Sequence, residues 1–263
     1  MTAPTGRTHG PPKFSIVTIV RNNAEGFEAT RRSVLDQNSC DFEWIVVDGA
    51  STDKTLHLVE TAFASGEAHG FSEPDRGIYD AMNKGLKAAT GDYIVFLNAG
   101  DRLLESDSLQ IVADAIDQAG QPDVAFFASK MTFGQKVIDR PAKSPNYIWH
   151  GQPGLHQATF FRREVHLQHP FSDRYRICGD YDVLARLRAS GARMQSFPQV
   201  IGNNSFDADA TSGRHKLRLI KEAVQIQRSE LHLPLWKCTA SVLFRSMNSF
   251  VFKLLTQINR RTT

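Results

Sequence analysis

Acidic side chains stand directly behind two apolar runs of the sequence. Asp48 ends the run FEWIVVD, and Asp101 closes the segment NAGD that follows YIVFL. Both runs have the length and the β-branched or aromatic content of buried strands. In open α/β sheets, ligands bind beyond the carboxyl ends of the strands. We therefore expect the carboxylates of Asp48 and Asp101 to face a shared cleft that binds a polar ligand.

An acid at the end of a strand has a second possible role, because Asp side chains also cap the helices that follow. Asp53 stands directly before a predicted helix over 54–64, so both roles are open for it. The sequence has no Gly-x-Gly-x-x-Gly after its first strand and no GxxxxGK[ST] segment. Dinucleotide-binding and P-loop sites therefore lack the glycine-rich loop that holds their phosphates.

The elements that position these acids alternate along the chain. Apolar runs predict strands over 14–20, 42–48, 93–97 and 123–128, and helical spacing predicts helices over 24–37, 54–64, 77–89, 107–119 and 179–191. Such alternation predicts an α/β fold with a mostly parallel sheet and helices on both faces. The stretch 130–178 is irregular, and we expect short strands and loops there. Two further helices, over 213–231 and 235–260, are predicted to close the chain.

Composition is that of a globular protein, and charge is unevenly distributed. Of 263 residues, 41% are hydrophobic and 22% are charged, which excludes a disordered, collagen-like or coiled-coil chain. Three separated cysteines suggest no zinc ribbon or disulfide scaffold, and fit a reducing cytosol. Residues 213–263 hold ten Lys and Arg against two Glu. We therefore expect a flexible tail over 1–13, a main domain over 14–212 and a basic helical extension over 213–263.

Four segments occur in an order and spacing that point to one family. They are VVDGASTDKT (46–55), EPDRGIYDAMNKGLKAATGDYIVFLNAGD (73–101), HQATFFRRE (156–164) and GDYDVLARL (179–187). Together they resemble the family 2 glycosyltransferases of the GT-A fold, in particular the bacterial group that builds capsular, exopolysaccharide and cell-envelope glycans. The resemblance covers about 14–190.

The resemblance implies a nucleotide-sugar donor, either a UDP- or a GDP-sugar. Asp48 matches the second-strand acid that holds the uracil or ribose, and Asp75 matches a second acid on the nucleotide. The same comparison assigns to the nucleotide-sugar site the residues Thr18, Asn22, Asp48, Asp75, Arg76 and Lys84. Arg76 and Lys84 would offset the charge of the diphosphate. A solvated surface role remains the alternative for Lys84.

The family's metal motif is Asp-x-Asp, and this sequence departs from it. It has Asn98-Ala99-Gly100-Asp101, so Asp101 keeps a carboxylate and Asn98 is a neutral partner. Mg²⁺ or Mn²⁺ suits such oxygen ligands together with substrate phosphates. The resemblance thus implies a divalent cation, held with one acid fewer than the motif has.

The resemblance also assigns the reaction chemistry. Asp180 matches the catalytic base, which removes the proton of the acceptor hydroxyl in an inverting transfer, and Asp182 is expected to face elsewhere. A helix cap before VLARL is the alternative role for Asp180. His156 and Gln157 match residues on the acceptor side of the cleft, where a structural role is also open for the histidine.

The C-terminal segment is amphipathic and basic. Apolar residues from Trp236 to Ile258 recur every three or four positions, with Lys and Arg in much of the remainder. Such a helix lies in a membrane interface or packs on its own domain. Because of the basic charge we expect a peripheral membrane contact through 235–261, and no nucleic acid.

These residues together predict an inverting glycosyltransferase at the cytoplasmic face of a bacterial membrane. Its acceptor would be a lipid-linked sugar or a growing envelope polysaccharide. The alternatives are a GT-A domain that binds a nucleotide-sugar or glycan without transferring it, which Asn98 keeps open, and a nucleotidyltransferase. The latter usually needs a basic glycine-rich loop after the first strand, which this sequence lacks.

Overall fold

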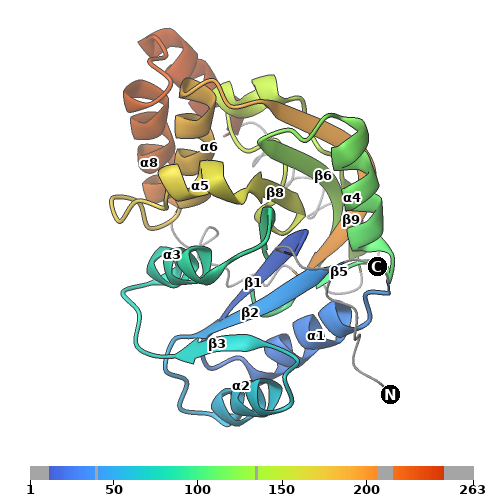
Figure 1. Ribbon diagram of the computed structural model, residues 1–263. Helices are drawn as coiled ribbons and strands as arrows, with labels where there is room; N and C mark the ends of the chain where they lie inside the picture. The colour runs from blue at the N-terminus through green and yellow to red at the C-terminus, as the bar shows by residue number, and fades with distance from the viewer. Residues whose placement is uncertain (1–11, 39–40, 134–135, 206–215, 246–263) are drawn as a thin grey trace, which may run out of the picture.

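The apolar runs form the parallel half of a central sheet. A computed structural model describes residues 12–38, 41–133, 136–205 and 216–245 (Figure 1). Three predicted strands are confirmed, and a fourth lies at the edge: β1 (Phe14–Val20), β2 (Phe42–Asp48), β4 (Tyr93–Phe96) and β3 (His69–Ser72). They are parallel in the order β3-β2-β1-β4. The carboxyl ends of these strands therefore meet at one edge of the sheet.

The other half of the sheet is largely antiparallel. Its strands are β5 (Asp101–Leu103), β6 (Val124–Phe133), β7 (Lys136–Arg140), β8 (Thr159–Arg162) and β9 (Met194–Ser205). β8 runs antiparallel to β4 and β6, β5 to β9, and β7 to β6, whereas β9 is parallel to β6. The expected parallel pairing thus holds for the first half only. β7 follows β6 after two residues, a connection too short for parallel pairing.

Helices cover both faces of the sheet, as predicted (Figure 1). One face carries α1 (Ala24–Leu35), α2 (Lys54–Ala64) and α4 (Ser108–Gln118), and the other carries α3 (Ile78–Ala88), α5 (Arg163–Gln168), α6 (Gly179–Ala189) and α8 (Lys216–Ser229). Each face has its own apolar core. Two 3₁₀ helices, η1 (Pro145–Trp149) and η2 (His156–Ala158), lie in the irregular stretch.

The C-terminal part of the described chain belongs to the second core. Ala223 and Ile226 of α8 are buried in the same apolar core as Tyr79 of α3 and Leu184 of α6. The expected domain boundary at residue 212 therefore does not mark the end of the packed core. The expected flexible tail over 1–13, except its last two residues, and the predicted helix beyond 245 lie outside the described residues.

A helix over 235–245 packs on the body through one side and exposes the other. Its Ser241 hydroxyl lies 2.8 Å from His150 Nδ1, and the Phe244 ring meets the edge of the His150 ring. The Arg245 guanidinium donates to the His150 carbonyl. Trp236 and Leu243, by contrast, are 67% and 65% exposed. Among the described residues, no helix is both long and apolar enough to cross a bilayer.

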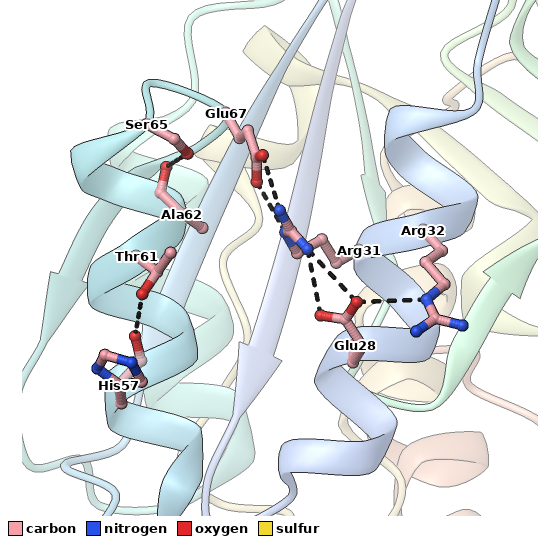
Figure 2. Close-up of polar contacts among 8 residues, drawn as sticks. All are labelled: Glu28, Arg31, Arg32, His57, Thr61, Ala62, Ser65 and Glu67. Atoms are coloured by element: carbon pink, nitrogen blue, oxygen red, sulfur yellow. Dashed lines mark hydrogen bonds and ion pairs between the residues drawn. The ribbon is translucent and has the colours of Figure 1, made fainter.

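A network of charges joins the two helices beneath the first half of the sheet. Arg31 of α1 donates from Nε and Nη2 to the two carboxylate oxygens of Glu67, each over 2.7 Å, and Glu28 accepts from the same guanidinium (Figure 2). Glu67 follows the end of α2, so this bidentate pair fixes α1 against the turn after α2. Arg32, one position along, is largely exposed, and in the described part of the chain its guanidinium pairs with Glu28 alone.

Candidate functional site

Asp48 organises the edge of the sheet at the end of β2. Its side chain is buried, and its Oδ2 accepts from the Ser51 backbone N–H at 2.9 Å and from the Ser72 hydroxyl at 2.5 Å. The Ser51 hydroxyl donates to Oδ1. The carboxylate thus ties the loop after β2 to the end of β3. Asp53 is the cap of α2, accepting from the Thr55 N–H at 2.9 Å, so the cap role holds for that residue.

Asn22 holds the loop after β2 against the end of β1. Its φ of 47° lies in the left-handed region, which Asn tolerates better than most residues. Its N–H donates to the Ser51 hydroxyl, and its Oδ1 accepts from the Thr52 N–H, both at 2.8 Å. Asn22 is exposed at this edge of the sheet.

Thr18 is a correction to the predicted donor site. Its side chain is fully buried, and its hydroxyl accepts a hydrogen bond from Trp44 Nε1 at 2.9 Å. Thr18 lies inside β1, two residues before the strand ends, with its side chain on the face that α1 and α2 cover. In this structure it is therefore not accessible to a ligand at the edge of the sheet.

Asp75 lies directly over the end of β2. Its Oδ1 accepts from the Gly77 N–H at 2.8 Å, which closes a turn before α3. A Cβ atom added to Gly49 would stand 2.3 Å from Asp75 Oδ2. Glycine at position 49 therefore lets the Asp75 carboxylate approach the residue that follows Asp48. The structure thus brings these two predicted nucleotide residues together.

The two predicted diphosphate cations are engaged with acids of their own segment. Arg76 is exposed and bonds to Asp80 at 3.0 Å. Lys84 is mostly covered, and its Nζ donates to the Pro74 carbonyl at 2.8 Å and pairs with Glu73 at 2.6 Å. Lys84 thus holds the 73–76 segment onto α3 and is not a freely solvated surface lysine.

Asp101 is the centre of a polar cluster at the end of the parallel strands. It is buried, and its Oδ2 lies 3.0 Å from His156 Nε2 and accepts from the Asn98 N–H at 3.1 Å. Asn204 of β9 donates to Oδ1 at 2.5 Å. Burial lowers the pKa of His156, but the Asp101 carboxylate outweighs it and raises that pKa to about 9. The histidine is therefore a cation paired with Asp101 near neutral pH.

The charges of His156 and Asp101 act on the carboxylate of Asp180. It lies in the first turn of α6 and is partly buried. Burial raises the pKa of Asp180, the His156 cation lowers it, and the Asp101 carboxylate raises it again, with a net increase. A carboxylate with a raised pKa binds a proton more strongly, as a general base requires. The structure thus brings together Asp101, His156 and Asp180, which lie far apart in sequence.

The contacts of the α6 acids exclude a cap role for Asp180 and pair Asp182 within the helix. The cap of α6 is Cys178, which makes no side-chain cap bond, so Asp180 is not the cap. Asp182 is buried and pairs with Arg186 at 2.9 Å on the same helix. Asp182 therefore faces elsewhere, as expected.

The donor set at Asp101 fits a divalent cation that shares its shell with a ligand. Asn98 Oδ1 is buried and makes no hydrogen bond to the described residues, while Nδ2 of the same amide lies 3.2 Å from His156 Nε2. A protonated His156 donates from that nitrogen, so the amide oxygen of Asn98 belongs on the side that faces His156 and Asp101. The Asp101 carboxylate offers about four acceptor positions, and three are used. No three His, Cys, Asp or Glu side chains in the described part of the chain converge to hold an ion alone. Phosphate oxygens would have to complete such a shell, as they commonly do for Mg²⁺.

Gln157 is placed differently from its neighbour. It is fully buried, and neither atom of its side-chain amide has a partner among the described residues. Only His156 of the predicted acceptor-side pair thus reaches the cluster. Asn204 is the residue that sequence reasoning missed, because β9 was not predicted and nothing else in the sequence connects it to Asp101.

Comparison with known proteins gives a consistent family. The model of the family described as "Glycosyl transferase family 2" matches residues 15–173. A PGL/p-HBAD biosynthesis glycosyltransferase of Mycobacterium tuberculosis is 32% identical over 204 residues, which are 72% of this chain and 75% of that protein. An uncharacterized glycosyltransferase of the same species is 40% identical over 161 residues, 57% of this chain and 58% of that one.

Solved structures confirm the fold. Staphylococcus aureus TarS 1–349 in complex with UDP has a TM-score of 0.65 at 18% identity, covering 83% of this chain and 65% of that chain. The mannosyltransferase PcManGT of Pyrobaculum calidifontis, in complex with GDP-Man and Mn²⁺, has a TM-score of 0.61 at 19% identity, covering 91% and 76%. The chain thus spans about two thirds to three quarters of these structures. The predicted GT-A fold is confirmed by these likenesses.

Proposed function

Because this chain belongs to glycosyl transferase family 2 and is a glycosyltransferase, we propose that it moves a sugar from a UDP- or GDP-sugar to an acceptor hydroxyl with inversion. The observation that carries the proposal is the cluster of Asp101, His156 and Asp180, which lies where the parallel strands end. A base, a cation and a metal-binding oxygen set are what such a transfer needs.

The donor is proposed to bind along the ends of β1, β2 and β3. Asn22 and Asp75 would contact the nucleoside, and Asp48 would act from beneath by holding the Ser51 loop in place. Arg76 and Lys84 would lie on the diphosphate side, since Arg76 directly precedes the N-cap of α3 and Lys84 ties the 73–76 segment to that helix. Structural neighbours crystallised with UDP, UDP-GlcNAc and GDP-Man support this donor class.

We propose that Asp101 and Asn98 hold a divalent cation, Mg²⁺ or Mn²⁺, together with the diphosphate. The ion would supply positive charge against the departing nucleoside diphosphate. The buried side-chain amide of Asn98, beside His156 and Asp101, supports this role, as does the Mn²⁺ in the PcManGT complex. His156, whose Nε2 faces the Asp101 carboxylate, would add a second positive charge on the same side.

Asp180 is the proposed base of the transfer. It would accept the proton of the acceptor hydroxyl while that oxygen attacks the anomeric carbon and the bond to the diphosphate breaks. One carboxylate suffices for inversion, because no covalent sugar intermediate forms. The raised pKa of Asp180 supports this assignment, since partial burial and the nearby Asp101 carboxylate make its own carboxylate a stronger base.

The acceptor is proposed to be a lipid-linked or envelope glycan met at the inner face of a bacterial membrane. The helix over 235–245 turns Leu235, Trp236 and Leu243 to the solvent, and the Lys237 ammonium lies 5.5 Å from the centroid of the Trp236 ring. Exposed apolar residues flanked by cations are typical of peripheral membrane helices. Mycobacterial relatives named for PGL/p-HBAD biosynthesis support a role in glycan biosynthesis.

A panel of nucleotide-sugars tests the donor proposal. A donor that binds the folded state raises the melting temperature, so UDP- and GDP-sugars are compared with and without Mn²⁺. The selected donor is then mixed with membrane lipid extract, and release of free UDP or GDP is followed. Binding without release would support the second candidate, a domain that binds without transfer, which Asn98 in place of an Asp favours.

A further inference from the structure

The segment 176–179 leads into the proposed base and is held from two sides. On one side stands Glu222 of α8, whose carboxylate accepts from three successive backbone N–H groups. Its Oε2 lies 2.9 Å from the Ile177 nitrogen and 3.0 Å from the Cys178 nitrogen, and its Oε1 lies 3.2 Å from the Arg176 nitrogen. Glu222 is 5% exposed and is the one acid of α8.

On the other side stands Tyr79 of α3. Its hydroxyl donates to the Ile177 carbonyl and accepts from the Gly179 N–H, both at 2.9 Å. Its ring stacks on Phe171, with centroids 5.3 Å apart. A Cβ atom on Gly179 would lie 2.5 Å from the Tyr79 ring, so glycine is needed for the ring to approach the backbone here. Tyr79 stands two residues after Gly77 of the donor-side turn.

These two side chains replace the missing cap of α6. The first N–H groups of a helix have no partner within the helix, and Cys178 supplies no side-chain oxygen for them. Glu222 and Tyr79 satisfy the N–H groups of Cys178 and Gly179 instead. Burial raises the pKa of Glu222, but hydrogen bonds from Arg218 and from the backbone of the segment lower it by more. The net pKa is below its usual value, so the carboxylate stays ionised. Asp180 follows immediately, so its place depends on these bonds.

We propose that Glu222 and Tyr79 are positioning residues that fix segment 176–179 and thereby place the Asp180 carboxylate for proton transfer. The proposal rests on the role of Asp180 in the proposed function. It makes α8 part of the catalytic apparatus, although its sequence is that of a basic extension. It also connects the donor-side turn, through Tyr79, to the base.

Two conservative variants test the proposal in the full-length chain. Tyr79→Phe keeps the stacked ring and removes both hydrogen bonds of the hydroxyl. Glu222→Gln replaces one acceptor oxygen with a donor that faces backbone N–H groups. Arg218→Gln is the matched control, because it removes the ion pair at 2.9 Å from Glu222 and leaves the segment's bonds in place.

The readouts are kcat for release of nucleoside diphosphate, affinity for UDP or GDP by calorimetry, and the melting temperature. We expect Tyr79→Phe and Glu222→Gln to lower kcat about 10- to 100-fold, the scale of a small misplacement of a catalytic group. Nucleotide affinity should stay within about twofold, since the donor contacts are untouched. Arg218→Gln should keep kcat within about twofold.

A double variant separates positioning from general damage. If Tyr79 acts through Asp180, then Tyr79→Phe should cost little further activity when Asp180 is already Asn. Full additivity of the two losses would overturn the proposal, as would folded Tyr79→Phe with normal kcat. Where Glu222→Gln does not fold, Tyr79→Phe decides alone. If the Asp180→Asn variant keeps its turnover, the proposed function fails. If Asp180→Asn loses turnover but Tyr79→Phe and Glu222→Gln keep theirs, only the positioning inference fails.

Discussion

Acidification should loosen the C-terminal helix through His150. This imidazole is 3% exposed, its Nδ1 meets the Ser241 hydroxyl, and the cations of Arg245 and Lys143 lie near it. Burial, then these two cations, lowers the pKa of His150 from 6.5 to about 4. The folded state thus keeps the ring neutral, whereas the unfolded chain binds a proton below pH 6.5. Stability is therefore complete above pH 6.5 and falls as the pH drops toward 4.

The size of the effect follows from the same two values. At pH 5 the unfolded histidine lies about 1.5 pH units below its own pKa, and each unit is worth about 1.4 kcal/mol, so folding loses about 2 kcal/mol. Urea unfolding at pH 7 and pH 5 measures this loss. His166 is buried with a similarly lowered pKa, so the wild type is compared with His150→Gln.

The variant should lose about 2 kcal/mol less than the wild type between the two pH values, because glutamine does not titrate. Identical losses in both proteins would refute the reasoning. So would a His150 pKa near 6.5 in an NMR titration of the folded protein.

Three further predictions concern the metal, the helix pair and the membrane. Asp101→Asn should abolish transfer and remove the Mn²⁺ dependence of UDP or GDP affinity; unchanged turnover in EDTA would contradict a metal at this site. Arg31→Gln should lower the free energy of unfolding by about 1–2 kcal/mol, since it breaks a charge-assisted bidentate pair, whereas Arg32→Gln should change it by less than about 0.5 kcal/mol. The double variant Trp236→Ser, Leu243→Ser should sediment less with anionic vesicles than the wild type, and added salt should reduce sedimentation of the wild type. Unchanged sedimentation of the double variant would contradict a membrane contact through this helix.

The first half of the fold was predictable because its strands are continuous apolar runs. FSIVTIV, FEWIVVD and YIVFL form β1, β2 and β4, and the acids behind the last two reach the expected edge. In the second half the apolar run over 123–128 correctly predicted a strand, β6, but the sequence did not show the largely antiparallel pairings, which join distant segments of mixed composition. β9 contains a proline and ends in polar residues, so neither the strand nor the contact of Asn204 with Asp101 was visible.

One wrong assignment and one omission at the site have different physical origins. The position of Thr18 was available in the sequence, since alternate residues of a strand share a face and Ile16 and Val20 are core residues of the α1 side. The role of Glu222 was not available, because only the packing of α8 shows which backbone N–H groups its carboxylate meets. The motifs therefore predicted which residues form the candidate site, whereas the residues that hold them in place are visible only in the folded structure.

The turnover of Asp180→Asn tests the central claim most directly. A positioned base contributes about 10²- to 10⁴-fold, so we predict a loss of at least that order in kcat, with UDP or GDP affinity nearly unchanged. Asp182→Asn is the matched control, because that carboxylate pairs with Arg186 on the same helix, and it should cost far less. A folded Asp180→Asn protein with near-normal turnover, or a larger loss at Asp182, would contradict the account.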